Sequence, residues 1–112
     1  MVISIKKQDT GCFIATAGEI FSKGDSVKSA LDGLLNILNN TGAEDIDLEC
    51  DIPSLFDYFP INVSAFARMI GINQDLMRQY KKGNVYISTQ RLMEIENAVH
   101  RLAKELSTLS LV

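Results

Sequence analysis

The acidic residues of segment 44–52 are the first candidates for chemistry, because carboxylates can bind metal ions and transfer protons. Glu44 begins the segment, and four further acidic residues, Asp45, Asp47, Glu49 and Asp51, alternate with Ile46, Leu48, Cys50 and Ile52. Strict alternation predicts a strand over 44–52 with one buried apolar face and one solvated acidic face. A calcium loop would need glycine where Cys50 stands, and metal-dependent nucleases gather carboxylates from several elements. We therefore expect a solvated strand face, with a functional acidic surface and a metal site as the alternatives.

Nucleophiles and general bases are sparse in this chain. The one histidine, His100, is expected to be a partly exposed structural residue beside the apolar stripe of a helix. Cys12 and Cys50 lack metal-ligand spacing and are expected to be buried, reduced thiols. No serine or cysteine has an evident base partner, and no glycine loop suits a phosphate. We expect no enzyme activity, no metal and no cofactor.

The stretch 62–83, NVSAFARMIGINQDLMRQYKKG, predicts two short helices joined by a tight turn. Asn62 is suited to cap a first helix over 63–70, and Asn73 is suited to cap a second. Gly71 ends the first helix, because glycine enters a left-handed turn without a Cβ penalty. Gly83 ends the second. Apolar residues recur at helical spacing on one side of each helix: Val63, Phe66, Ala67, Ile70, Leu76, Met77 and Tyr80.

These positions resemble the helix-turn-helix of phage-repressor-like regulators. That motif carries a small residue in its first helix, a glycine four residues later and an apolar residue six further on, here Ala67, Gly71 and Met77. The resemblance implies binding of double-stranded DNA, with the second helix in the major groove. A structural helical hairpin is the alternative.

The resemblance also divides the exposed side chains by role. Base contacts are expected from the recognition helix, at Gln74, Asp75, Arg78 and Gln79. Phosphate contacts are expected from Ser64, Arg68, Asn73, Lys81 and Lys82. Because Asp75 would repel phosphate, it should accept from a cytosine amino group or pair with a neighbouring base-reading side chain.

The net charge of −3 conceals an uneven distribution. Residues 1–59 hold four Lys and Arg against ten Asp and Glu, a balance of −6. Residues 60–112 hold seven against four, a balance of +3, so the positive charge lies in the half with the paired helices. This excess is modest, and single-copy affinity for DNA should be weak and sensitive to salt.

The N-terminal half predicts a small sheet covered by one helix. Strands are expected over 2–7, 12–17 and 19–22, and their short connections favour an antiparallel meander. A helix beginning at Asp25-Ser26 has an apolar face that must lie on this sheet, and residues 39–42 should stop it. The expected fold class is α+β, with the sheet and its covering helix in 1–52 and an all-helical segment in 53–112.

The C-terminal half adds two further helices to the predicted pair. Pro53–Phe59 should form a short helix anchored by Leu55, Phe56 and Phe59. Ser88 should cap a long helix reaching about Leu106, with a stripe at Leu92, Ile95, Val99, Leu102 and Leu106. The segment 107–112 could be a strand or a frayed end.

Two short stretches, Thr10-Gly11-Cys12-Phe13 and Lys23-Gly24-Asp25-Ser26 leading to Ala30, resemble HicB-like proteins. The resemblance implies a partial RNase-H-like sheet followed by a DNA-binding segment. It also implies an antitoxin that covers a small RNase toxin, which would be basic, and represses its own operon.

No apolar stretch reaches the ~18 residues of a membrane span, and the first residues lack a signal peptide's apolar block. We therefore expect a cytoplasmic protein.

The function expected from the sequence is sequence-specific transcription regulation by a HicB-like antitoxin or autorepressor. A homodimer is expected, because two-fold symmetry doubles the few phosphate contacts of one helix. Its contact would be the edge of the sheet, or the last helix and the segment that follows. The alternative is a protein-interaction or dimerisation module that does not bind DNA.

Overall fold

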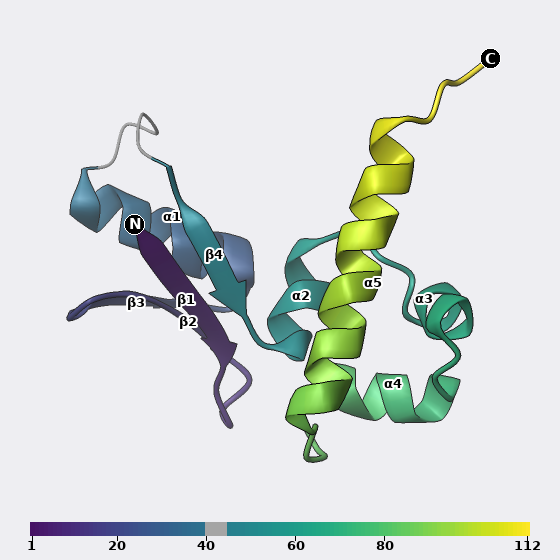
Figure 1. The fold of residues 1–112 in the computed structure, drawn as a ribbon. Coiled ribbons are helices and arrows are strands. Elements are labelled where there is room, and N and C mark those ends of the chain that lie inside the picture. The colour runs from purple at the N-terminus through teal and green to yellow at the C-terminus, as the bar shows by residue number, and fades with distance from the viewer. Residues whose placement is uncertain (40–44) are drawn as a thin grey trace.

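The N-terminal half is a four-stranded mixed sheet (Figure 1). The computed structural model describes residues 1–39 and 45–112. The first three strands are β1 (Val2–Lys7), β2 (Phe13–Ala17) and β3 (Ile20–Gly24). β2 pairs antiparallel with both β1 and β3, which confirms the predicted meander. Strand β4 (Asp47–Cys50) pairs parallel to β1, and the order across the sheet is β3-β2-β1-β4.

Helix α1 (Val27–Leu38) covers one face of this sheet, as predicted. The Oγ of Ser26 accepts from the backbone N–H of Ser29 and caps its first turn. The helix packs closely on the end of β3, where a Cβ on Gly24 would lie 2.6 Å from the backbone nitrogen of Ala30. Asn39 ends the helix in a left-handed conformation. The rest of the predicted stop, residues 40–42, lies outside the described residues. The core between helix and sheet consists of Ile3, Ile5, Phe13, Ala15, Val27, Ala30, Leu31 and Leu34.

The prediction of a buried apolar face on segment 44–52 is wrong. All four residues of β4 are exposed, including Leu48 at 41% and Cys50. Leu48 is paired with the buried Ile3, so both side chains lie on the α1 side of the sheet. β4 is an edge strand, however, and α1 packs on β2 and β3 rather than over it. Within 45–52, the described part of this segment, only Ile46, just before the strand, packs against this core, and Glu44 lies outside the described residues.

The predicted strand also ends early, because Asp51 begins helix α2 (Ile52–Tyr58). Its Oδ1 accepts from the N–H of Ser54, and its Oδ2 accepts from the N–H of Lys7 at the end of β1. Both carboxylate oxygens are therefore used within the fold, and Asp51 is not part of a free acidic face. Ile52 is buried in the helical core rather than on a strand.

Helix α2 joins the two halves of the molecule (Figure 1). The carboxylate of Asp57 accepts from the N–H of Val27 at 2.8 Å and so satisfies one free donor at the start of α1. The buried Oγ of Ser54 lies 3.5 Å from the carbonyl oxygen of Ile5. Leu55 and Phe56 are buried as predicted, but Phe59 is 42% exposed because it lies beyond the last turn.

The second core lies among α2 and three further helices: α3 (Val63–Ile70), α4 (Gln74–Lys82) and α5 (Thr89–Ser107). Ser88 caps α5 as predicted. Of its predicted stripe, Ile95 is buried and Val99 and Leu102 are half-buried, whereas Leu92 is 40% exposed and Leu106 is 59% exposed. The segment 107–112 forms no strand and extends away from the other helices (Figure 1). Among the described residues, no helix is both long and apolar enough to cross a membrane.

Candidate nucleic-acid interface

Three local signals fix the backbone of α3 and α4. The Oδ1 of Asn62 accepts from the N–H of Ala65 at 2.8 Å and caps α3. Gly71 turns the chain at φ +78°, a conformation that side-chain-bearing residues rarely adopt. The Oδ1 of Asn73 then accepts from the N–H groups of Asp75 and Leu76, at 2.9 and 3.1 Å. Each feature agrees with the sequence prediction for this stretch.

Close packing holds the two helices at one orientation. Ala67 in α3 and Met77 in α4 are both fully buried, and Ile72 fills the turn between them. Tyr80 is buried in the same core, which α5 completes with Ile95 and Ala98. The opposite side of α4 is left to solvent, and its charged and amide side chains are carried there on a rigid support.

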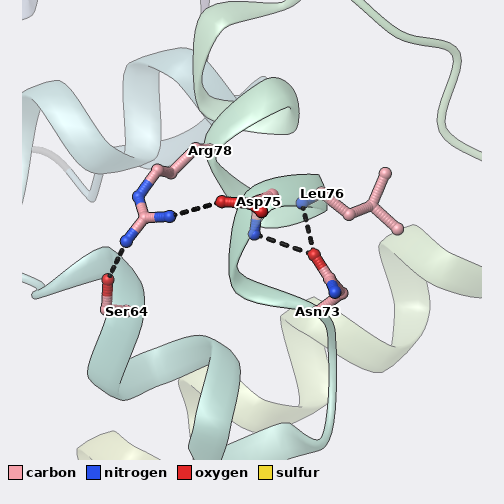
Figure 2. Close-up of polar contacts among 5 residues, drawn as sticks. All are labelled: Ser64, Asn73, Asp75, Leu76 and Arg78. Atoms are coloured by element: carbon pink, nitrogen blue, oxygen red, sulfur yellow. Dashed lines mark hydrogen bonds and ion pairs between the residues drawn. The ribbon is translucent and has the colours of Figure 1, made fainter.

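The arrangement brings three of the predicted contact residues together (Figure 2). Arg78 Nη1 donates to Asp75 Oδ1 at 2.7 Å, and Arg78 Nη2 donates to Ser64 Oγ at 2.8 Å. Asp75 thus pairs with a neighbouring side chain of α4, and the base-reading role expected of Arg78 stays a prediction. The link from Arg78 to Ser64 spans α3 and α4 and was not predicted. No signal within either helix could reveal it, because it depends on how the helices cross.

This network orients the Arg78 guanidinium without burying it. The side chains of Arg78 and Asp75 are 49% and 83% exposed, and exposed ion pairs contribute at most about 1 kcal/mol. A guanidinium carries five N–H donors in a fixed fork. The pair can therefore open, or keep its contacts while other donors of Arg78 bind a ligand, at little cost.

The other predicted residues lie around this network. Arg68 and Gln74, with Asp75 and Arg78, line an open hollow of about 430 Å³ at the turn. The side-chain oxygen of Asn73 accepts the two capping bonds, and its amide nitrogen remains able to donate to a phosphate. Gln79 is exposed on α4, and Lys81 is exposed in the last turn of the same helix.

Lys82 lies on the same helical stripe as Asp75 and Arg78, by the spacing of three and four residues. It also lines a separate hollow of about 760 Å³, between the end of α4 and the end of the sheet. Lys6 and Lys7 share this hollow with Glu49 and Asp51. Lys82 is therefore the one predicted phosphate ligand that has carboxylates of the N-terminal half nearby.

The groups considered for other chemistry are dispersed. Cys12 is half-buried and Cys50 is exposed, so the prediction of two buried thiols is wrong, although both thiols are free. Cys50 lines the hollow beside the sheet, where partial loss of hydration raises the pKa of its thiol, with a smaller contribution from the Asp51 carboxylate. His100 is exposed on α5. Among the described residues, no three His, Cys, Asp or Glu side chains are grouped as a metal site would need.

Comparison with known proteins gives no relative for this chain. No family model, no curated protein and no solved structure matches it.

Proposed function

We propose that the chain is a sequence-specific regulator of transcription that binds double-stranded DNA through α3 and α4. In this proposal the pair acts as a helix-turn-helix, and α4 enters the major groove, which is wide enough for one α-helix. The observation that carries the proposal is the fork of Arg78, which Ser64 and Asp75 hold at the exposed side of α4. An oriented guanidinium is the side chain best suited to the two acceptors of a guanine edge.

The charge distribution supports this orientation. The excess of positive charge lies in residues 60–112, and Arg68 on α3 and Lys81 and Lys82 on α4 are all exposed. Phosphates on either side of the groove would meet these three side chains together with Ser64 and the amide of Asn73. Gln74 and Gln79 would reach the neighbouring base edges, since both lie on α4 outside the core.

A finer proposal follows from the HicB-like stretches of the sequence. The sheet with α1 would be a partial RNase-H-like module, and the protein would act in the cytoplasm as an antitoxin or autorepressor of its own operon. The exposed acidic residues of β4, Asp47 and Glu49, would suit the surface of a basic RNase toxin. The open reading frame beside the gene would identify such a partner.

A second candidate is a protein-interaction module that does not bind DNA. It is favoured by the apolar groove between the α2–α3 connection and α5, a surface that DNA binding does not use.

Selection of duplexes from a randomised library tests the main proposal. We expect the full chain to enrich a common site of several base pairs. The double variant Lys81→Ala/Lys82→Ala should weaken binding to that site and reduce its salt slope by about two units. Lys23→Ala/Lys28→Ala is the matched control, since it removes the same charge from exposed positions on β3 and α1, outside the hollow that Lys82 lines. Failure to enrich any site, or equal loss in both double variants, would contradict the proposal.

A further inference from the structure

An uncharged groove lies along the second half of α5. Its volume is about 510 Å³, and its lining comes from α2, the α2–α3 connection, α3 and α5. The lining residues include Phe59, Met69, Leu102, Ala103 and Leu106, and none of the residues that line it carries a charge. Phe59, Met69 and Leu106 are 42%, 38% and 59% exposed, so water meets apolar side chains on both walls. Exposed apolar surface that gathers in one concave place marks a binding site.

The chain itself supplies a segment with the chemistry of this groove. Residues 107–112, STLSLV, carry no charged side chain, and polar and apolar residues alternate from Thr108 to Leu111. Leu109 and Leu111 are 62% and 90% exposed, and neither belongs to a hydrophobic core of the described residues. A segment in which alternate residues are apolar presents one apolar side when extended, and six residues span at most ~20 Å.

The segment does not lie in the groove of its own chain. α5 continues to Ser107, and the residues that follow extend away from α2 and α3 (Figure 1). The helix end is fixed by a bond from the N–H of Thr108 to the carbonyl of Glu105, which continues the helical direction. To reach its own groove, the segment would have to reverse at this point and unwind the last turn.

We infer that the groove receives segment 107–112 of a second copy of this chain. Two copies related by a two-fold axis would exchange their segments, so that each groove–segment contact is made twice. Leu109 and Leu111 of one copy would cover Leu102, Ala103 and Leu106 of its partner, and the second half of each α5 would lie beside the other. The small side chain of Ala103, exposed on the groove's edge, leaves room for this approach. The inference does not rest on DNA binding and is tested without DNA.

The first test is the mass of the full chain in solution, by sedimentation equilibrium between 1 and 100 μM. We expect a dimer. The variant Leu109→Ser/Leu111→Ser should raise the dimer dissociation constant at least about tenfold, because it removes two central apolar contacts from each groove. Both residues are outside the cores, so the fold should remain, as circular dichroism would verify. The matched control is Ile37→Ser, which changes a 55% exposed apolar residue on α1.

A mixing experiment distinguishes a dimer that exchanges segment 107–112 from dimers with a different interface. Ala103→Glu blocks the groove but keeps the segment, while Leu109→Ser/Leu111→Ser keeps the groove but spoils the segment. Each variant alone should be mostly monomeric, and their mixture should form a one-to-one heterodimer that retains one intact contact. A monomeric wild-type chain at 100 μM would overturn the inference. Wild-type-like dimerisation of either variant, or no association of the mixture, would also overturn it.

Discussion

Asp75 is the residue whose position constrains the DNA-binding account most. A carboxylate on the exposed side of a recognition helix repels phosphate, yet here it accepts from Arg78 and lies 83% exposed. Its contribution is therefore to orientation rather than to attraction. In the proposed complex, the same ion pair would lower the effective charge that α4 presents to non-specific DNA, and both effects would favour discrimination between sites over raw affinity.

Replacing Asp75 should separate these two effects. We expect Asp75→Asn to raise the affinity for a scrambled duplex about two- to fivefold, since it removes one negative charge near phosphate. The ratio between selected and scrambled duplexes should fall, because Arg78 loses the partner that orients it. Fluorescence anisotropy titrations on both duplexes measure this ratio. Glu94→Gln is the control, since it removes the same charge from the comparable Arg91–Glu94 pair on α5. An unchanged ratio in Asp75→Asn would show that the pair does not position Arg78.

Among the elements, α2 connects the two cores. Asp51 caps it and also binds the end of β1, and Asp57 near its other end caps α1. Helix α2 thus fixes the sheet and its covering helix against the helical half through two carboxylates. Each accepts from a backbone N–H that would otherwise lack a partner at the end of an element.

The cap from Asp57 should be measurable in stability. We expect Asp57→Ala to lower the free energy of unfolding by about 1–2 kcal/mol, because the N–H of Val27 loses its acceptor at the start of α1. Urea denaturation followed by circular dichroism gives the value. Asp32→Ala is the control: Asp32 pairs with Lys28 on the exposed side of α1, and its loss should cost less than about 0.5 kcal/mol. Equal losses in the two variants would show that the cap contributes nothing special.

For helices and strands, the sequence predicts features that depend on neighbouring residues along the chain. It does not predict features that depend on contacts between different elements. The caps at Ser26, Asn62 and Ser88 were predictable, since a capping side chain bonds backbone groups three residues away. The exposure of Leu48 was not predictable, because alternation reveals which residues share a face but not whether a helix covers it. The contact of Arg78 with Ser64 joins residues fourteen apart and depends on the crossing of two helices.

For the whole molecule, the two halves carry opposite net charges, and we expect them to bind partners of opposite charge. The positive half carries the α3–α4 pair, whereas Asp45, Asp47 and Glu49 are exposed at and before β4, on the edge of the sheet. Charges beyond a Debye length of about 8 Å are largely screened at physiological salt. Asp45 and Asp47 lie outside the hollow that Glu49 shares with Lys82, and we expect these two carboxylates to have little effect on a duplex bound at α4.

Neutralising the edge carboxylates tests this separation. We expect Asp45→Asn/Asp47→Asn to leave the affinity for the selected duplex within about twofold at 150 mM salt. Glu49 is kept because it shares a hollow with Lys82, and Asp51 is kept because it caps α2. The measurement is a titration of wild type and variant on the same duplex. A gain or loss of more than about tenfold would place the edge of the sheet against the DNA.

The affinity ratio between selected and scrambled duplexes tests most directly whether α4 reads base sequence. The variants to compare are Arg78→Ala and Lys82→Ala. Titrations at several salt concentrations give this ratio and the salt slope together. Arg78→Ala should cost about 1–3 kcal/mol on the selected duplex and bring the ratio toward one. Lys82→Ala should weaken both duplexes alike and lower the salt slope by about one unit. If Arg78→Ala weakens both duplexes equally and keeps their ratio, Arg78 does not read bases and the account is contradicted.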